Sequence, residues 1–121
     1  MERVVGIGGV FLKAHDPKKL AAWYSTHLGI PIGPGQTYAA MTSSDAGEMT
    51  VWSAFPIDTP YFGPGTATFM VNYRVKNLDA MLAQLRTAGA QVEDKVESYD
   101  YGRFGWATDP EGNRFELWEP K

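Results

Sequence analysis

The clearest structural signal in the 121-residue chain lies near its end, at Thr108-Asp109-Pro110-Glu111-Gly112-Asn113-Arg114-Phe115-Glu116-Leu117. Its proline presets φ and its glycine can take a positive φ, so the segment predicts a tight turn between two strands. Side chains of the following strand alternate between two faces. One face, expected to meet a helix, carries Phe115 and Leu117, and the other carries Arg114, Glu116 and Trp118.

Upstream of this turn, the chain shows one order of elements twice. Residues 4–14 predict a strand, and a helix follows from the cap Asp16 to the closing Gly29. Residues 67–75 predict the matching strand, and a second helix runs from the cap Asn77 to Gly89. Strand-rich segments follow each helix. In the first copy they span 36–42 and 48–55, separated by the turn formers Ser43-Ser44-Asp45-Ala46-Gly47.

Residues 56–65 contain three prolines and two glycines, which predicts a connector rather than regular structure. We therefore expect one domain over 1–121, with repeat one at about 4–55 and repeat two at about 66–120. The predicted fold class is α+β. Two β-α-β-β-β repeats are expected to form mixed sheets that curve into a cup, with the helices on the outer face.

Composition narrows the class of protein. Hydrophobic residues make up 44% and charged residues 21%, and no segment approaches the roughly 20 apolar residues of a membrane span. The net charge of −3, without a basic stripe, argues against nucleic acid as a partner. The absence of cysteine excludes disulfides and thiolate ligands. No export signal is recognisable, and we expect a cytoplasmic protein without membrane partners.

The sequence resembles a known superfamily in two places. The opening residues 7–16, with Trp23-Tyr24 and Leu28-Gly29-Ile30-Pro31 behind them, are similar to a first strand and helix. The closing residues 108–117 resemble the most recognisable motif. This is the vicinal-oxygen-chelate superfamily, which includes glyoxalase I, bleomycin-resistance proteins and extradiol dioxygenases. The resemblance covers nearly the whole chain and implies a homodimer.

Metalloenzymes of this superfamily place ligands on the first and last strands of each repeat, facing the cup. The corresponding positions here hold Gly9, Met70, Val51 or Trp52, and Glu116. Only Glu116 is a metal-binding type, whereas catalytic zinc sites use three protein ligands. We therefore expect no cofactor, and a divalent metal is the second candidate. The two histidines, His15 and His27, are expected to be ordinary surface or partly buried residues.

The same alternation predicts which side chains line the cup. The expected ligand-binding residues around Glu116 are Phe11, Lys13, Met70, Asn72, Arg74, Arg114 and Trp118, together with Trp106, whose facing the alternation leaves open. Further aromatic residues whose facing is open are Tyr38, Tyr61, Phe62, Tyr99, Tyr101 and Phe104. Aromatic walls with a few polar groups suit a flat or partly apolar organic molecule, and the alternative is that these rings fill the core.

Glu116 is the candidate catalytic residue. Burial among apolar neighbours would raise its pKa and allow acid or base catalysis, and Arg74 or Arg114 would oppose that shift. The alternative is a carboxylate held in a salt bridge. The chain is thus predicted to bind a small organic molecule without metal, either sequestering it or transforming it with Glu116. Two alternatives remain: a metal-dependent lyase or dioxygenase, and a non-catalytic interaction module.

Overall fold

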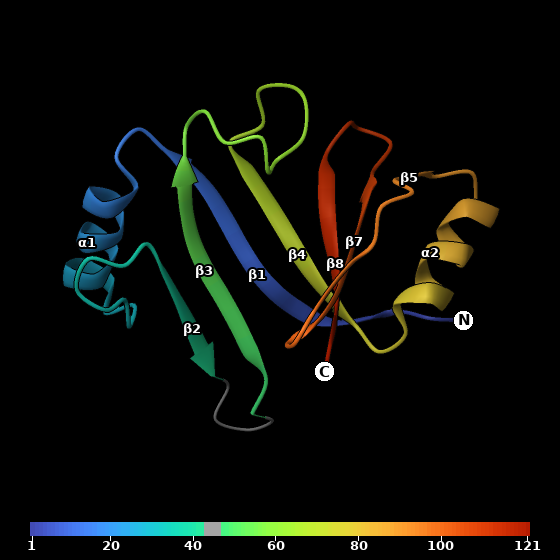
Figure 1. Ribbon diagram of the computed structural model, residues 1–121, viewed down its shortest axis with the longest axis horizontal. Helices are drawn as coiled ribbons and strands as arrows, with labels where there is room; N and C mark the ends of the chain where they lie inside the picture. Colours follow the sequence, from blue (N-terminus) through green and yellow to red (C-terminus); the bar gives the residue numbers. More distant parts are fainter. Residues whose placement is uncertain (43–46) are drawn as a thin grey trace. The chain divides into compact units, whose positions relative to one another are not determined.

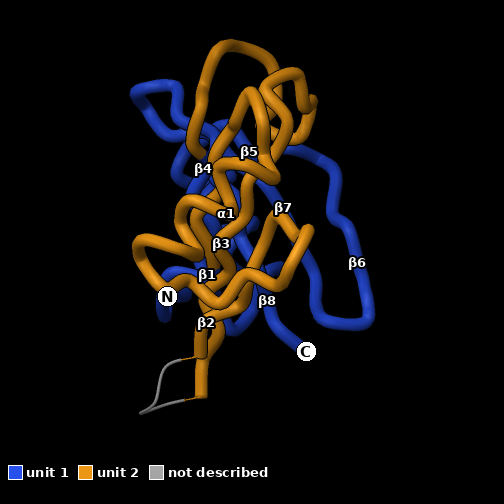
Figure 2. The backbone as a smooth tube through the Cα atoms, turned by 90° about the vertical axis from the view of Figure 1, so that its left-hand side faces the viewer, with its two compact units in different colours: residues 1–8, 70–121 blue, residues 9–69 orange. Residues whose placement is uncertain are grey.

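The computed structural model describes residues 1–42 and 47–121, and these form two compact units. One unit comprises residues 9–69, and the other comprises residues 1–8 together with 70–121 (Figure 2). The turn expected at 43–47 lies outside the described residues, except for Gly47. The first strand contributes to both units, so the units do not coincide with the repeats expected at about 4–55 and 66–120.

The elements follow one another along the chain in the order of the colours in Figure 1. They are β1 (Val4–Ala14), α1 (Pro17–Leu28), β2 (Tyr38–Thr42), β3 (Met49–Pro56), β4 (Phe69–Val75), α2 (Leu78–Thr87), β5 (Gln91–Val92), β6 (Glu97–Tyr99), β7 (Gly102–Thr108) and β8 (Arg114–Pro120). Strand, helix and strands thus occur twice in this order, and the α+β class is confirmed. Among the described residues, no helix is long and apolar enough to cross a membrane.

In the unit of residues 9–69, β3 pairs in parallel with β1 and antiparallel with β2. Helix α1 begins where the Asp16 side chain accepts a hydrogen bond from the Lys19 backbone N–H, with a proline in its first turn. It ends at Gly29, whose φ of 68° is the left-handed value that glycine tolerates best. The helix packs on one face of the strands around the buried residues Leu12, Ala21, Trp52 and Ala54.

This unit has one strand fewer than expected. Residues 29–37, between α1 and β2, contain no strand, although Ile30-Pro31-Ile32 is apolar. A proline has no backbone N–H to donate to a ladder, and the Ile32 N–H bonds locally to the Ile30 carbonyl. Ile30 and Ile32 instead pack against the core under α1. Their hydrophobicity therefore reflects burial and not strand pairing.

In the other unit, β8 pairs in parallel with β4 and antiparallel with β7. The short strands β5 and β6 both pair with β7, along the edge that β8 leaves open. Together they act as one strand interrupted at residues 93–96. If β5 and β6 are counted as one strand, the unit of residues 1–8 and 70–121 keeps the expected order of strand, helix and three strands.

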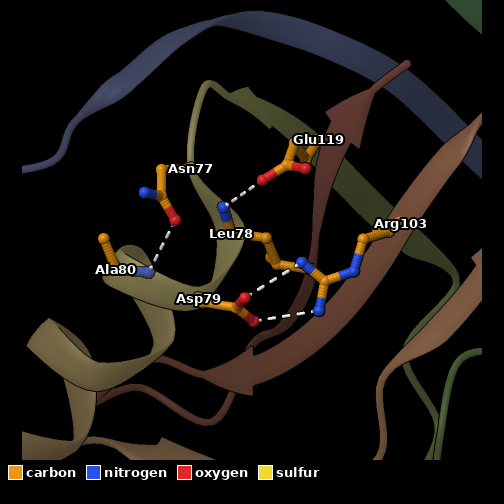
Figure 3. Close-up of polar contacts among 6 residues, drawn as sticks. All are labelled: Asn77, Leu78, Asp79, Ala80, Arg103 and Glu119. Atoms are coloured by element: carbon orange, nitrogen blue, oxygen red, sulfur yellow. Dashed lines mark hydrogen bonds and ion pairs between the residues drawn. The ribbon is translucent and has the colours of Figure 1, made fainter.

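Helix α2 is held at its first turn by three neighbouring polar groups (Figure 3). The cap Asn77 accepts a hydrogen bond from the Ala80 N–H at 3.0 Å, as the sequence predicts. Glu119 of β8 accepts a second one from the Leu78 N–H at 2.7 Å. Arg103 of β7 forms a bidentate pair with Asp79. These contacts fix the helix to the strands that also carry the candidate site.

The alternation predicted for the last strand is confirmed. Leu117 is 1% exposed and belongs to the core under α2 with Val75, Leu78, Met81 and Leu82, and Phe115 packs against that core. The turn before β8 is held by Asp109, whose side chain accepts hydrogen bonds from the backbone of Glu111 and Asn113. The face opposite α2 therefore belongs to Glu116 and its neighbours.

Candidate functional site

Glu116 lies at the centre of the candidate site and is fully buried. It stands on β8 directly opposite Asn72 of β4 and Trp106 of β7, so the register brings all three side chains to one face. The Asn72 Nδ2 donates to the Glu116 Oε1 at 2.5 Å, and the Trp106 Nε1 donates to the Oε2 at 2.9 Å. Each carboxylate oxygen therefore accepts a hydrogen bond from a neutral donor.

Asn72 is held tightly between Glu116 and the first strand. Its side chain is 2% exposed, and its Oδ1 has no hydrogen-bond partner among the described residues. The position that a Cβ on Gly8 would occupy is 2.1 Å from this oxygen and 2.9 Å from the Trp118 ring. A side chain at position 8 would therefore displace Asn72. The glycine allows the β1 backbone to approach the site.

Trp118 forms the next part of this face. Its ring is 6% exposed and lies parallel to the Phe104 ring, with centroids 5.9 Å apart. Its Nε1 donates to the Tyr101 carbonyl at 3.3 Å. Gly102, at a φ of 143°, leaves room for the indole, because a Cβ there would lie 2.5 Å from the Trp118 Nε1.

Arg114 borders the site on the same strand as Glu116. It forms a bidentate ion pair with Glu93, at 2.7 and 2.9 Å, and its guanidinium lies 5.4 Å from the centre of the Trp106 ring. The Arg114 hydrogen bonds hold the pKa of Glu93 below its ordinary value, and partial burial opposes them. The Arg114 Nη1 also lies 3.6 Å from the sulfur of Met70.

Arg74 is the second arginine expected at the site. It is 8% exposed, and its Nη1 donates to the Ile7 carbonyl at 3.2 Å. Gly6 makes room for it, because a Cβ there would lie 2.3 Å from the Arg74 Nη2. Two glycines of β1, Gly6 and Gly8, thus accommodate the polar side chains of β4.

The predicted residues Phe11 and Lys13 belong to the unit of residues 9–69. Phe11 packs against Phe55 and Tyr61 at centroid distances of 5.6 and 6.3 Å. Lys13 lies over the Phe62 ring at 5.4 Å. The structure therefore gathers Met70, Asn72, Arg74, Trp106, Arg114, Glu116 and Trp118 in one unit, and Phe11 and Lys13 in the other. The site described by its contacts is the Glu116 face of the unit of residues 1–8 and 70–121.

Comparison with protein families gives a match over most of the chain. A family described as the glyoxalase-like domain matches residues 9–118, which is nearly the whole chain. The chain belongs to the glyoxalase-like domain family. The predicted membership of the vicinal-oxygen-chelate superfamily is thereby confirmed. No curated protein sequence matches the chain.

Solved structures show the same fold at low sequence identity. Methylmalonyl-CoA epimerase from Mycobacterium tuberculosis is 22% identical, with a TM-score of 0.69 over 98% of this chain and 89% of its own. A methylmalonyl-CoA epimerase variant from Streptomyces coelicolor, in complex with 2-nitronate-propionyl-CoA, is 14% identical, with a TM-score of 0.72 over 96% and 97%. A glyoxalase/bleomycin resistance protein/dioxygenase superfamily member from Vibrio splendidus is 16% identical, with a TM-score of 0.60 over 98% of both chains.

The positions that would hold a metal in this glyoxalase-like domain do not suit one. Gly9 has no side chain, Met70 is a weak ligand for a hard or borderline cation, and Glu116 already accepts hydrogen bonds from Asn72 and Trp106. Within residues 1–42 and 47–121, no group of three or more His, Cys, Asp or Glu side chains could hold a metal ion. The residues present therefore do not fit the metal site that the resemblance implies.

Strand register corrects one of these assignments. Glu116 stands opposite Asn72, and the residue matching Asn72 in the first repeat is Phe11, 61 positions earlier. Phe11 stands opposite Ser53. The first-repeat counterpart of Glu116 is thus Ser53, not Val51 or Trp52. Trp52 points to the opposite face, where it belongs to the core under α1.

Local sequence patterns do not identify every residue that contributes to the Glu116 face. Phe104 lies two residues before Trp106 on β7 and shares its face, so alternation along a strand would have assigned it once the strand was known. Gly8 and Glu93 carry no local signal in the sequence, because their roles depend on contacts with Asn72 and Arg114, which are 64 and 21 positions away in the chain.

Proposed function

We propose that this glyoxalase-like protein binds a small, partly apolar organic molecule on the Glu116 face, without a divalent metal. One observation carries the proposal. The carboxylate is fully buried, accepts hydrogen bonds from Asn72 and Trp106, and lies on the same face as the Trp118 ring. A fixed polar group among aromatic rings is the usual composition of a small-molecule site.

Glu116 acts in this proposal as the group that positions its neighbours. Its Oε2 fixes the plane of the Trp106 indole, and its Oε1 fixes the amide of Asn72. The Arg114 guanidinium holds the Trp106 ring from another side. A ligand would thus meet rings whose orientation is already set, which lowers the entropy cost of binding.

The protein either sequesters the bound molecule or converts it. The superfamily that the sequence resembles contains both binding proteins and enzymes. The epimerase neighbours act on a coenzyme A thioester by name, but at 14% and 22% identity they support the fold alone. Sequestration is the simpler outcome here, because both oxygens of Glu116 already accept hydrogen bonds. Recovery of the ligand unchanged after incubation with the protein would establish it, and a changed product would show conversion.

The test is a thermal-shift screen of organic compounds and divalent ions on wild type and Glu116→Gln. We expect one class of partly apolar compounds to raise the Tm of wild type, and to raise that of Glu116→Gln less. Zinc, manganese and magnesium salts should leave both proteins unchanged. Glu111→Gln is the matched control, because Glu111 is exposed in the turn before β8.

The opposite pattern would overturn the proposal. If divalent ions stabilise wild type but not Glu116→Gln, or if ligands bind only after metal is added, the metal-dependent alternative is correct. If no compound class shifts wild type, the non-catalytic interaction module is favoured. Light scattering on the same preparation tests the homodimer that the resemblance implies.

A further inference from the structure

Two tyrosines at the tip of the β6–β7 hairpin form an exposed aromatic pair. Tyr99 is 47% exposed and Tyr101 is 60% exposed. Their rings are nearly parallel, at an interplanar angle of 5° and a centroid distance of 5.3 Å. Two large rings that stack on each other while facing solvent form a surface for a third flat group.

The tyrosine pair is continuous with the Glu116 face. Both tyrosine rings meet the edge or face of Phe104, at 5.9 and 5.8 Å. Phe104 stacks on Trp118, and the Trp118 indole donates to the Tyr101 carbonyl. Exposure falls from 60% at Tyr101 to 6% at Trp118. A path of four rings therefore leads from solvent to the residue two positions from Glu116.

The local charge makes the Tyr99 ring electron-rich. Its hydroxyl donates to the Glu97 carboxylate, which Lys95 also contacts at 2.6 Å. This hydrogen bond raises the pKa of Tyr99, and the negative charges of Glu97 and Glu116 add to the effect. A phenol that donates to a carboxylate shifts electron density toward its ring. Such a ring attracts cations and electron-poor rings.

We propose that Tyr99 and Tyr101 form an outer stacking platform of the ligand site and select planar, electron-poor aromatic molecules. The inference rests on the proposed function, because the platform leads to the Glu116 face. A ligand would cover the outer face of the pair. It would not enter between the rings, because their centroids are 5.3 Å apart and an inserted ring needs roughly 7 Å between planes.

Three flat probes of similar size test the selection: N-methylquinolinium, the neutral naphthalene-2-methanol and the anionic naphthalene-2-sulfonate. Binding is followed by NMR, through the tyrosine ring signals and the Trp118 indole N–H. We expect N-methylquinolinium to bind wild type most tightly and the sulfonate least. Tyr99→Leu and Tyr101→Leu should each weaken N-methylquinolinium about fivefold. Tyr99→Phe, which keeps the ring but not the bond to Glu97, should weaken it about twofold.

Trp23→Leu is the matched control. Trp23 is 52% exposed and packs on Tyr24 at 5.4 Å, but it lies on α1 in the other unit. We expect this variant to bind every probe as wild type does. Circular dichroism checks that each variant is folded. We expect all of them to fold, because the replaced side chains are exposed.

The outcomes separate this inference from the proposed function. If the leucine variants bind N-methylquinolinium as wild type does while Glu116→Gln weakens it, the platform is wrong and the Glu116 site stands. If the three probes bind equally, selection for electron-poor rings is wrong. If no probe perturbs Tyr99 or Tyr101 in wild type, the platform is also wrong, and the thermal-shift screen alone decides the proposed function.

Discussion

The two units carry different kinds of side chain at the same pair of strand positions, polar at both positions in one unit and aromatic at one of them in the other. In the unit of residues 1–8 and 70–121 the pair is Asn72 and Glu116, joined by a buried hydrogen bond and completed by Trp106. In the unit of residues 9–69 the matching pair is Phe11 and Ser53, where Phe11 packs with the rings of Phe55 and Tyr61. The repeat preserves the backbone pairing while the chemistry of the face differs.

This difference shows what a buried polar group requires of its surroundings. An aromatic ring needs only apolar contact, so neighbours of several types can pack against Phe11. A buried carboxylate needs donors at specific positions, because an unmet donor or acceptor costs roughly 1–3 kcal/mol. The unit that holds Glu116 accordingly contains glycines at positions 6 and 8, where side chains would displace Arg74 and Asn72.

The largest expected effect comes from removing the polar centre of one unit. Glu116→Ala leaves the donors of Asn72 and Trp106 without their acceptor and creates a cavity, and should cost about 3–5 kcal/mol of unfolding free energy. Ser53→Ala at the matching position should cost less than about 1 kcal/mol. Urea denaturation followed by circular dichroism measures both. Equal losses would show that the two positions are not energetically different.

A second prediction concerns the close approach of β1. Gly8→Ala places a methyl group against Asn72 and the buried Trp118 ring, and such overpacking should cost about 1–3 kcal/mol. Gly33→Ala is the comparison in the other unit, because its nearest atom is a flexible part of Gln36 at 3.4 Å. It should be neutral or slightly stabilising. The comparison fails if urea unfolding shows Gly33→Ala to be the more damaging change.

The smallest expected change in stability separates two contacts of cationic side chains by their pH dependence: the Arg114–Glu93 ion pair and the contact of Lys13 with the Phe62 ring. The pKa of Glu93 is lowered in the folded state by Arg114, so this pair contributes stability above the ordinary glutamate pKa and loses it as pH falls through the lowered value. Glu93→Gln should therefore cost up to about 1 kcal/mol at pH 7, since the Glu93 side chain is 40% exposed and solvent screens the pair. The cost should disappear in strong acid.

Lys13→Met supplies the contrast in the unit of residues 9–69. Lys13 lies over the Phe62 ring, a partner without a titrating group. Its loss should change stability by a similar amount at neutral and acid pH. Urea denaturation of the two variants and wild type at several pH values measures the difference. A Glu93→Gln effect that persists in strong acid would show that the ion pair is not its cause.

Much of the local structure followed from the sequence. Asp16 and Asn77 are the helix caps that their residue types predict, and Gly29 closes the first helix in the left-handed conformation. The alternation in β8 separated Glu116 from Phe115 and Leu117 correctly. These features depend on backbone chemistry within a few residues, so local patterns are sufficient to predict them.

The apolar run Ile30-Pro31-Ile32 shows a limit of such patterns, because hydrophobicity alone does not distinguish a buried loop from a paired strand. Local patterns also do not fix which residue of the first repeat corresponds to Glu116, for which the sequence suggests Val51 or Trp52. Only the pairing of Phe11 with Ser53 identified the equivalent position.

The amino-acid sequence is sufficient for the α+β repeat, the two helices with their caps, the turn before the last strand, and Glu116 as the single carboxylate among the expected ligand positions. The contacts of that carboxylate depend on the folded structure. Asn72, Trp106 and Glu116 meet because three separate strands pair in one register, and Gly8 lets β1 approach them. Alternation along one strand gives the face on which a side chain lies, but its partner on the neighbouring strand depends on how the strands pair across the sheet.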